Sequence, residues 1–249
     1  MIRLIVKILG PCCLLLFTSI KCLAQLPADS VSRDQLIENT IVAFNSAIGE
    51  QARLYNGPEY DIYEPFIKGN AYFNDNKEFV TGNVEYDGFK FKDASMLYDM
   101  HKDVLVVLSA NKVSKIALIK ERLSNFDMAG HHFVNINADT LAKSSNIASG
   151  IYDELYGGKS RVLVKRRKNL QEAGNLSGAI ETYFNSLKET FLLHNGVYTS
   201  VGSKGSVLDV FKDKKEELRR YIKSDNIDFK KNQELAITMV ATYYDRLTK

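Results

Sequence analysis

The chain has 249 residues, of which 25% are charged, and a formal net charge of +3. Its three cysteines, Cys12, Cys13 and Cys22, all lie within the first 24 residues, together with three basic residues and no acidic one. Without that segment the chain has no cysteine and no net charge. Disulfides, thiolate catalysis and cysteine-bound metals are then excluded, and the overall charge gives no argument for nucleic acid as a partner.

Residues 1–24 are predicted to be a cleavable signal peptide. Arg3 and Lys7 precede an apolar stretch, and Cys22-Leu23-Ala24 places small residues where signal peptidase cleaves. The apolar stretch is about a dozen residues long, against roughly 20 for a retained transmembrane anchor. We therefore expect the mature chain to begin at Gln25, to be exported to the periplasm, the cell surface or the medium, and to contain no transmembrane span.

The first element of the mature chain is expected to be a helix. Ser30 or Ser32 is a suitable N-cap, and Gly49 is a suitable stop. The apolar residues that share one helical face at this spacing are Ile37, Ile41, Phe44 and Ile48.

Three dipeptides in the middle of the chain predict β-hairpins: Asp87-Gly88, Gly157-Gly158 and Asn195-Gly196. Two-residue turns of these types supply the positive φ that a twisted hairpin needs. We therefore expect positive φ at the second residue of each dipeptide, which is Gly88, Gly158 or Gly196. Further strands are expected at residues 104–108, 113–119, 123–126 and 132–136. Together they predict an antiparallel meandering sheet, with a curved or half-barrel form as a variant.

The end of the chain is expected to form two amphipathic helices. The first would be capped within Ser206–Asp209 and would bury Leu208, Phe211, Leu218 and Ile222; the second would bury Leu235, Met239, Tyr243 and Leu247. The predicted class is therefore α+β. The expected organisation is a signal peptide (1–24), an N-terminal helix with the antiparallel β region (25–205), and a C-terminal helical pair packed on that region (206–249).

Several segments together resemble a family of exported, uncharacterised bacterial cell-envelope proteins. They are residues 53–60, 97–99, 150–156 and 164–168, and the tail from Ser206 to Asp245. The resemblance implies a bacterial origin and a periplasmic or surface address. It implies no activity, so no functional residue is carried over from it.

The histidines are the first candidates for chemistry. His101 lies between Asp99 and Asp103, either of which could orient it as a general base. His131 and His132 would point to opposite faces of a strand, so one metal could not easily use both. No nucleophile is recognisable near any of them, and no motif for a metal or cofactor is present. A hydrolase that uses His101 or His131 with carboxylates is therefore an alternative hypothesis, and no cofactor is expected.

The densest charge run is Lys165-Arg166-Arg167-Lys168, which follows an apolar strand pattern. Its simplest interpretation is a strand that continues into solvent; its functional interpretation is a contact with an anionic lipid headgroup, an anionic glycan or an envelope protein. Residues 25–140 carry a net charge of −6 and residues 141–249 one of +6, which fits two complementary halves or a basic surface. We expect a non-catalytic binding or structural module of the cell envelope, with a carrier of lipid or another apolar ligand as the alternative binding function.

Overall fold

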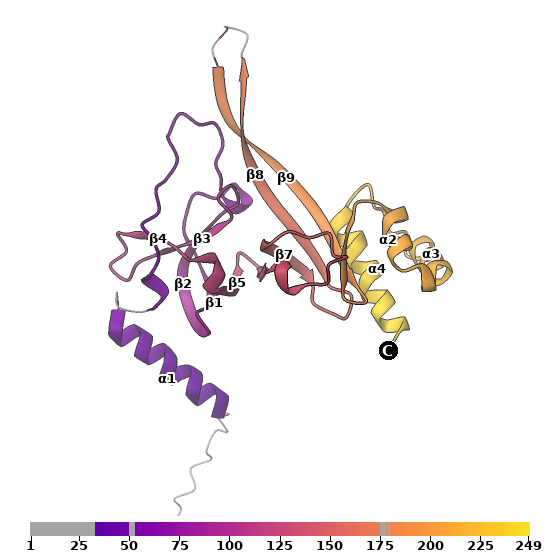
Figure 1. Cartoon of the computed structure of the whole chain (residues 1–249), viewed down its shortest axis with the longest axis horizontal. Helices are drawn as coiled ribbons and strands as arrows, with labels where there is room; N and C mark the ends of the chain where they lie inside the picture. The colour runs from indigo at the N-terminus through magenta and orange to yellow at the C-terminus, as the bar shows by residue number, and fades with distance from the viewer. Residues whose placement is uncertain (1–32, 50–52, 175–177, 179) are drawn as a thin grey trace, which may run out of the picture. The chain divides into compact units, whose positions relative to one another are not determined.

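The computed structural model describes residues 33–49, 53–174, 178 and 180–249 (Figure 1). The predicted signal peptide and the helix caps at Ser30 and Ser32 lie outside these residues. The helices are α1 (Arg33–Ile48), α2 (Lys204–Val210), α3 (Lys215–Ser224) and α4 (Gln233–Leu247). The strands are β1 (Val80–Tyr86), β2 (Phe89–Asp99), β3 (Val104–Leu108), β4 (Lys115–Ala117), β5 (Leu123–Met128), β6 (His131–Ile136), β7 (Gly150–Tyr156), β8 (Val162–Gly174), β9 (Ile180–His194) and β10 (Val197–Val201).

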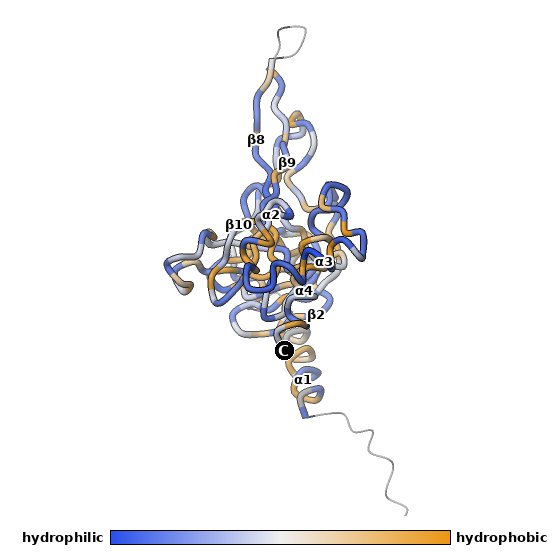
Figure 2. Tube along the Cα trace, turned by 90° about the vertical axis from the view of Figure 1, so that its right-hand side faces the viewer, coloured by the Kyte–Doolittle hydropathy of each residue, from blue (hydrophilic) through white to orange (hydrophobic). Residues whose placement is uncertain are grey.

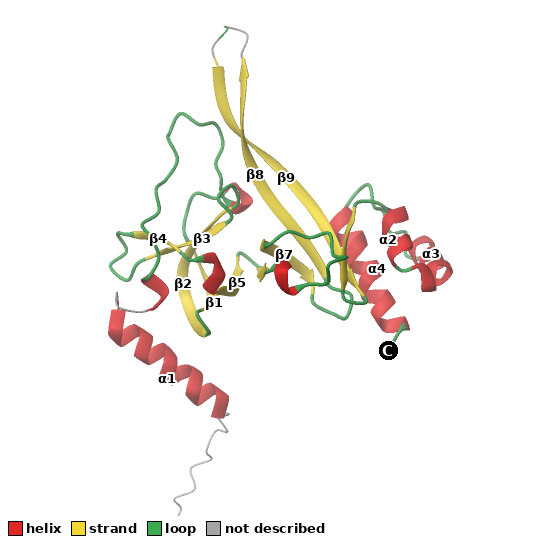
Figure 3. Cartoon of the chain, viewed as in Figure 1, coloured by secondary structure: helices red, strands yellow, loops and turns green. Residues whose placement is uncertain are grey.

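All these strands join one open antiparallel sheet in the order β10-β9-β8-β7-β6-β5-β1-β2-β3-β4 (Figure 3). Most neighbours in the sheet are also neighbours in the chain, because short turns join them. The predicted α+β class and the antiparallel meander are therefore confirmed. Among the described residues, none of the helices combines the length and the apolar composition that crossing a bilayer requires.

The hairpin glycines follow the prediction at two of three positions. Gly88 and Gly196 have φ of +79° and +77° and join β1 to β2 and β9 to β10. Gly158 was predicted wrongly: its φ is not in the left-handed region, and residues 157–161 form a longer connection between β7 and β8. A side chain at Gly158 would collide with Tyr156 and Asp245, so close packing, and not turn geometry, accounts for glycine here.

Alternating residues place an apolar core on each face of the sheet. One core lies over β1, β2, β3, β5 and β6 and contains the stacked rings of Phe126 and Phe133, whose centroids are 4.6 Å apart. On the opposite face, Tyr60 and Tyr72 from the segment before β1 pack against Leu97 of β2. The segment that precedes β1 therefore covers the sheet from one side.

Helices α2, α3 and α4 cover one face of the other end of the sheet, where Val162 of β8 and Leu192 of β9 are fully buried. Figure 2 shows apolar residues gathered where these helices meet the strands. The connection at residues 137–149 covers the opposite face, where Leu163 and Phe191 pack with Tyr152. Val162 and Leu163 are successive residues of β8, so their side chains point to opposite faces of the sheet. The C-terminal helices and the 137–149 connection therefore cover opposite faces.

Two details of the C-terminal helices differ from the prediction. The expected first helix is two helices, α2 and α3, separated at Phe211; α2 is capped by Ser203, which forms a capping box with Ser206. The buried face of α4 contains Ile237, Val240, Ala241 and Tyr244. The predicted face was wrong, because Leu235 is 54% exposed and Leu247 is 37% exposed. Helix α4 is apolar around much of its circumference, so periodicity alone does not identify the buried side.

Helix α1 forms where its pattern predicts it and is followed by Gly49 with φ of +52°. Its predicted apolar face is largely exposed: Ile37 is 49% and Phe44 is 62% exposed.

Strands β8 and β9 continue beyond β7 and β10 as an arm (Figures 1 and 3), in which Lys68 also pairs with Tyr183 of β9. Thirteen register pairs join the two strands, whereas β7 pairs with β8 only up to Val164. The arm beyond that point is mostly hydrophilic (Figure 2). The basic run was predicted to continue the strand into solvent, but the sequence did not predict that β8 extends to Gly174 or that β9 begins at Ile180, because these residues lack the apolar alternation of a half-buried strand.

Candidate functional site

The turn between β2 and β3 carries the first part of the site and is fixed by Asp99. The carboxylate of Asp99 is fully buried. One oxygen accepts from the hydroxyls of Tyr60 at 2.8 Å and Tyr63 at 2.7 Å. The other accepts from the backbone N–H groups of His101 and Lys102 at 2.8 and 2.9 Å. Burial and the Asp99 charge raise the pKa of both tyrosines, so their hydroxyls stay protonated as donors and hold the turn rigid.

The second part of the site is a buried ion pair between this turn and β8. The ammonium group of Lys165, whose side chain is 7% exposed, lies 2.7 Å from Asp103 and also donates to the carbonyl of Ile151 at 3.0 Å. Lys120 lies 2.8 Å from the other carboxylate oxygen of Asp103. Gly150 makes this approach possible, since a side chain there would collide with both Asp103 and Lys165.

Burial and the charge of the partner have opposite effects on the pKa of both Asp103 and Lys165. Burial alone would raise the pKa of Asp103, but Lys165 and Lys120 outweigh it and lower the pKa. Burial lowers the pKa of Lys165, against the opposing effect of Asp103. Burial also raises the pKa of Tyr152, over whose ring Lys165 lies at 5.0 Å, to about 12. A buried lysine with a perturbed pKa beside a cavity is a recognised mark of a functional site.

A cleft of about 360 Å³ opens beside this ion pair; we call it the Lys165 cleft. The polar side chains that line it come from the β2–β3 turn, the 137–149 connection, β7, β8 and β9: they are His101, Asp103, Asn146, Ser149, Tyr152, Lys165, Arg167, Asn169 and Glu189. The sequence candidates His101 and the basic run, which are 64 residues apart, therefore meet in one cleft.

Strand alternation divides the basic run between the two faces of the sheet. Lys165 and Arg167 lie opposite Glu189 and Leu187 in the β8–β9 ladder, while Arg166 and Lys168 lie opposite Lys188 and Ser186. Arg167 is about half exposed and lies 3.2 Å from Glu189. The run does continue a strand, but Lys165 and Lys168 are buried at 6% and 4% exposure, because neighbouring segments pack over the base of the arm.

On the opposite face, Arg166 and Lys168 are held by carboxylates. The Arg166 guanidinium bridges Asp153, which is 1% exposed, and Glu234 of α4, at 2.7 Å from each. Lys168 contacts Asp75 and donates to the carbonyl of Asn70 at 2.7 Å. These two residues line a second hollow of about 340 Å³. Their donors are directed to groups of the chain itself, which indicates a structural role in joining α4 and the 70–75 segment to the sheet.

His101 is oriented differently from the expectation, whereas His131 and His132 follow it. The Nδ1 atom of His101 lies 2.8 Å from the carbonyl of Lys168, and neither Asp99 nor Asp103 contacts its ring. His131 and His132 do point to opposite faces: their Nδ1 atoms lie 2.9 Å from Asp153 and 2.7 Å from Asp127. Within the part of the chain that the structure describes, no serine or threonine hydroxyl bonds to these rings, and no cluster of three or more acidic, histidine or cysteine side chains could hold a metal.

Sequence reasoning missed the residues that complete the cleft: Asn146, Ser149, Tyr152, Asn169 and Glu189. No local pattern marks them, because they are ordinary polar residues of strands and of one connection. A comparison of this chain with known protein families, with curated proteins and with solved structures found no match.

Proposed function

We propose that the protein is an exported binding module of the cell envelope that holds a small ligand with an anionic group in the Lys165 cleft. The observation that carries the proposal is the pair of alternate β8 residues Lys165 and Arg167 on one wall of a 360 Å³ cleft. The predicted signal peptide supports export. The packed interface between the C-terminal helices and the sheet directs the proposal to this cleft and away from an apolar carrier site.

The donors of the two residues differ in their availability. Two contacts, to Asp103 and the carbonyl of Ile151, occupy the Lys165 ammonium. Arg167 makes one contact with Glu189 through Nη2, which leaves further N–H groups of its planar fork for a carboxylate or phosphate. Lys120, Lys165 and Arg167 together outnumber Asp103 and Glu189, so the local charge favours an anion. Arg167 is therefore the expected contact and Lys165 the fixed charge behind it.

Replacing Arg167 with glutamine tests this site. We expect at least a tenfold loss of affinity for a phosphate-bearing ligand, since a bidentate charged contact contributes about 1.5–3 kcal/mol. Stability should change by less than about 1 kcal/mol, because the Arg167–Glu189 pair is exposed. The measurement is calorimetric titration with glucose 1-phosphate, together with sedimentation with phosphatidylglycerol vesicles, which separates a sugar phosphate from a lipid headgroup.

The exposed Arg220 of α3, a helix that covers the sheet face opposite the Lys165 cleft, serves as the matched control in an Arg220→Gln variant. Binding of either ligand that is the same in Arg167→Gln and in the control would contradict the proposal, as would failure of the unaltered protein to bind both.

A second candidate function is hydrolysis that uses His101. The carbonyl of Lys168 can only accept, so it fixes the proton of a neutral His101 ring on Nδ1 and leaves Nε2 as a base. Asp103 and Glu189 line the same cleft. If the cleft is catalytic, turnover of p-nitrophenyl acetate or p-nitrophenyl phosphate should fall at least a hundredfold in His101→Gln; equal slow rates in the two proteins would exclude this candidate.

A further inference from the structure

The first half of β2 has an outer edge with no strand beside it. Strand β3 pairs with β2 only from Met96 to Asp99. In the stretch from Phe89 to Ser95, β1 occupies one side, and no other segment among the described residues forms backbone hydrogen bonds on the other side. Because Phe91 pairs with Val84 in the ladder, the N–H and C=O groups of Lys90 point away from β1.

The two end strands of the sheet, β4 and β10, have covered edges, unlike this part of β2. At β4, the segment before Tyr60 covers the edge: Tyr60 donates to the carbonyl of Lys115 at 2.7 Å, and Ala117 donates to that of Pro58 at 2.9 Å. At β10, Asn146 donates to the carbonyl of Tyr198 at 3.0 Å. Proteins cover such edges because an open edge pairs with another chain. The outer edge of β2 from Phe89 to Ser95 has no such cover among the described residues.

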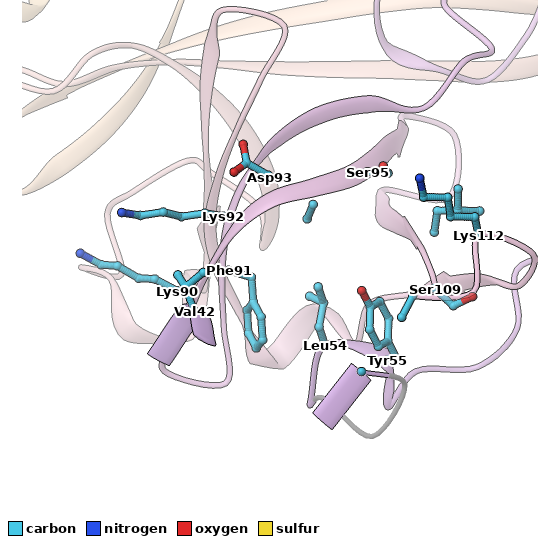
Figure 4. A pocket seen from close by; sticks show the side chains of 14 residues that line it. Val42, Leu54, Tyr55, Lys90, Phe91, Lys92, Asp93, Ser95, Ser109 and Lys112 are labelled. Atoms are coloured by element: carbon cyan, nitrogen blue, oxygen red, sulfur yellow. The ribbon is translucent and has the colours of Figure 1, made fainter. Parts of the chain in front are cut away.

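A groove of about 420 Å³ runs along this open edge (Figure 4). Figure 4 shows Leu54, Tyr55 and Phe91 around the hollow, with Lys90 and Lys92 directed outward on one side and Lys112 on the other. Leu54 and Phe91 are buried at 3% and 7% exposure and form an apolar floor. The groove therefore combines apolar side chains, unpaired backbone groups and a lysine-rich rim.

We infer that this groove binds an extended, acidic segment of a partner polypeptide, which adds a strand to the edge of β2. An acyl chain would cover the backbone groups of Lys90 without satisfying them, which is unfavourable, whereas a strand supplies the missing donors and acceptors. Three lysines at the rim, Lys90, Lys92 and Lys112, outnumber the two carboxylates near them, Asp93 of the lining and Glu38, which pairs with Lys90 and Lys92. This site is separate from the Lys165 cleft and does not depend on the function proposed there.

The lysines also decide between a partner and a second copy of the chain. Pairing two β2 edges would bring like charges at Lys90 and Lys92 close together, which destabilises a strand pair. These lysines are placed to hold carboxylates, since Lys92 already lies 2.9 Å from Glu38 and Lys90 lies 3.9 Å from it. An acidic partner would supply further carboxylates to the same ammonium groups.

The test uses fluorescence anisotropy with the purified protein and a labelled heptapeptide that alternates glutamate and valine. We expect it to bind at least tenfold more tightly than the matching lysine–valine peptide. The affinity of the peptide should fall at least tenfold when its alternate amides are N-methylated, because methylation removes the edge hydrogen bonds. The affinity of the unmethylated peptide should also fall at least tenfold in the double variant Lys90→Glu, Lys92→Glu. A Lys143→Glu control should bind the peptide as the unaltered protein does.

Both lysines are substantially exposed, at 66% and 42% of their side chains, so the double variant is expected to fold, and an unchanged thermal melting curve checks this. Equal binding of the methylated and unmethylated peptides would overturn the inference. So would tight binding of sodium dodecanoate without peptide binding, or a dimer in sedimentation equilibrium that a Lys90→Gln, Lys92→Gln variant strengthens by removing the like charges.

Discussion

Deletion of α4 by truncation after Asp228 should abolish the cooperative unfolding transition. Helix α4 covers Val162 of β8 and Leu192 of β9, both fully buried, and it packs on Phe211 through the stacked ring of Tyr244 at 3.9 Å. Burying each large apolar side chain contributes about 1.5–3 kcal/mol. The loss of several such contributions removes much of a typical domain stability of roughly 5–15 kcal/mol. Circular dichroism and thermal melting check this result.

A pair of single substitutions on α4 gives the same test with a matched control. Ile237 is fully buried, so Ile237→Ala should cost about 2–5 kcal/mol. At roughly 2–4 °C per kcal/mol for a chain of this size, the melting temperature should fall clearly. Leu235 is 54% exposed on the other side of the helix, so Leu235→Ala should change stability by less than about 0.5 kcal/mol. The reverse order of the two effects would show that Leu235, and not Ile237, faces the sheet.

Replacing Arg166 with methionine should cost about 3–5 kcal/mol, because it leaves the buried carboxylate of Asp153 without a permanent cation. It also removes one of the two cations that hold Glu234 of α4. The adjacent Arg167→Met, which breaks only an exposed pair with Glu189, should cost less than about 1 kcal/mol. Urea unfolding of the two variants measures the contrast between neighbouring residues of one basic run. Similar costs for both would refute a buried, structural role for Arg166.

The same ion pairs predict the response to acid. Burial alone would raise the pKa of Glu234, but its hydrogen bonds to Arg166 and Lys188 outweigh burial and hold the pKa below its ordinary 4.5. The folded state therefore binds the Glu234 proton less tightly than the unfolded state. The contribution of the Glu234 carboxylate to the free energy of unfolding is complete above pH 4.5. It is lost as the pH falls through the pKa of Glu234 in the folded state. Arg166→Met should consequently show a smaller loss of stability over this acidic range than the unaltered protein.

The sequence alone determined the class of the fold and most of its strands. Asp87-Gly88 and Asn195-Gly196 predicted their hairpins because a two-residue turn requires positive φ, and this requirement is local. The α1 and α4 patterns predicted helices for the same reason: each depends on residues within a few positions of one another. The buried side of α4 was not determined in this way, since the choice between Ile237 and Leu235 depends on what the helix packs against.

Only the tertiary structure decided the sites. The sequence marked residues 165–168 as one basic run, but strand alternation sends Lys165 and Arg167 to the cleft and Arg166 and Lys168 to the opposite face. The partners of these residues are distant in the chain: Asp103 lies 62 residues from Lys165, and Glu234 lies 68 residues from Arg166. The open edge of β2 is likewise a property of strand pairing, because a strand's sequence does not state along which part of its length a neighbour pairs with it. Periodicity reports local geometry, whereas ion pairs and free edges arise from contacts between segments that only folding brings together.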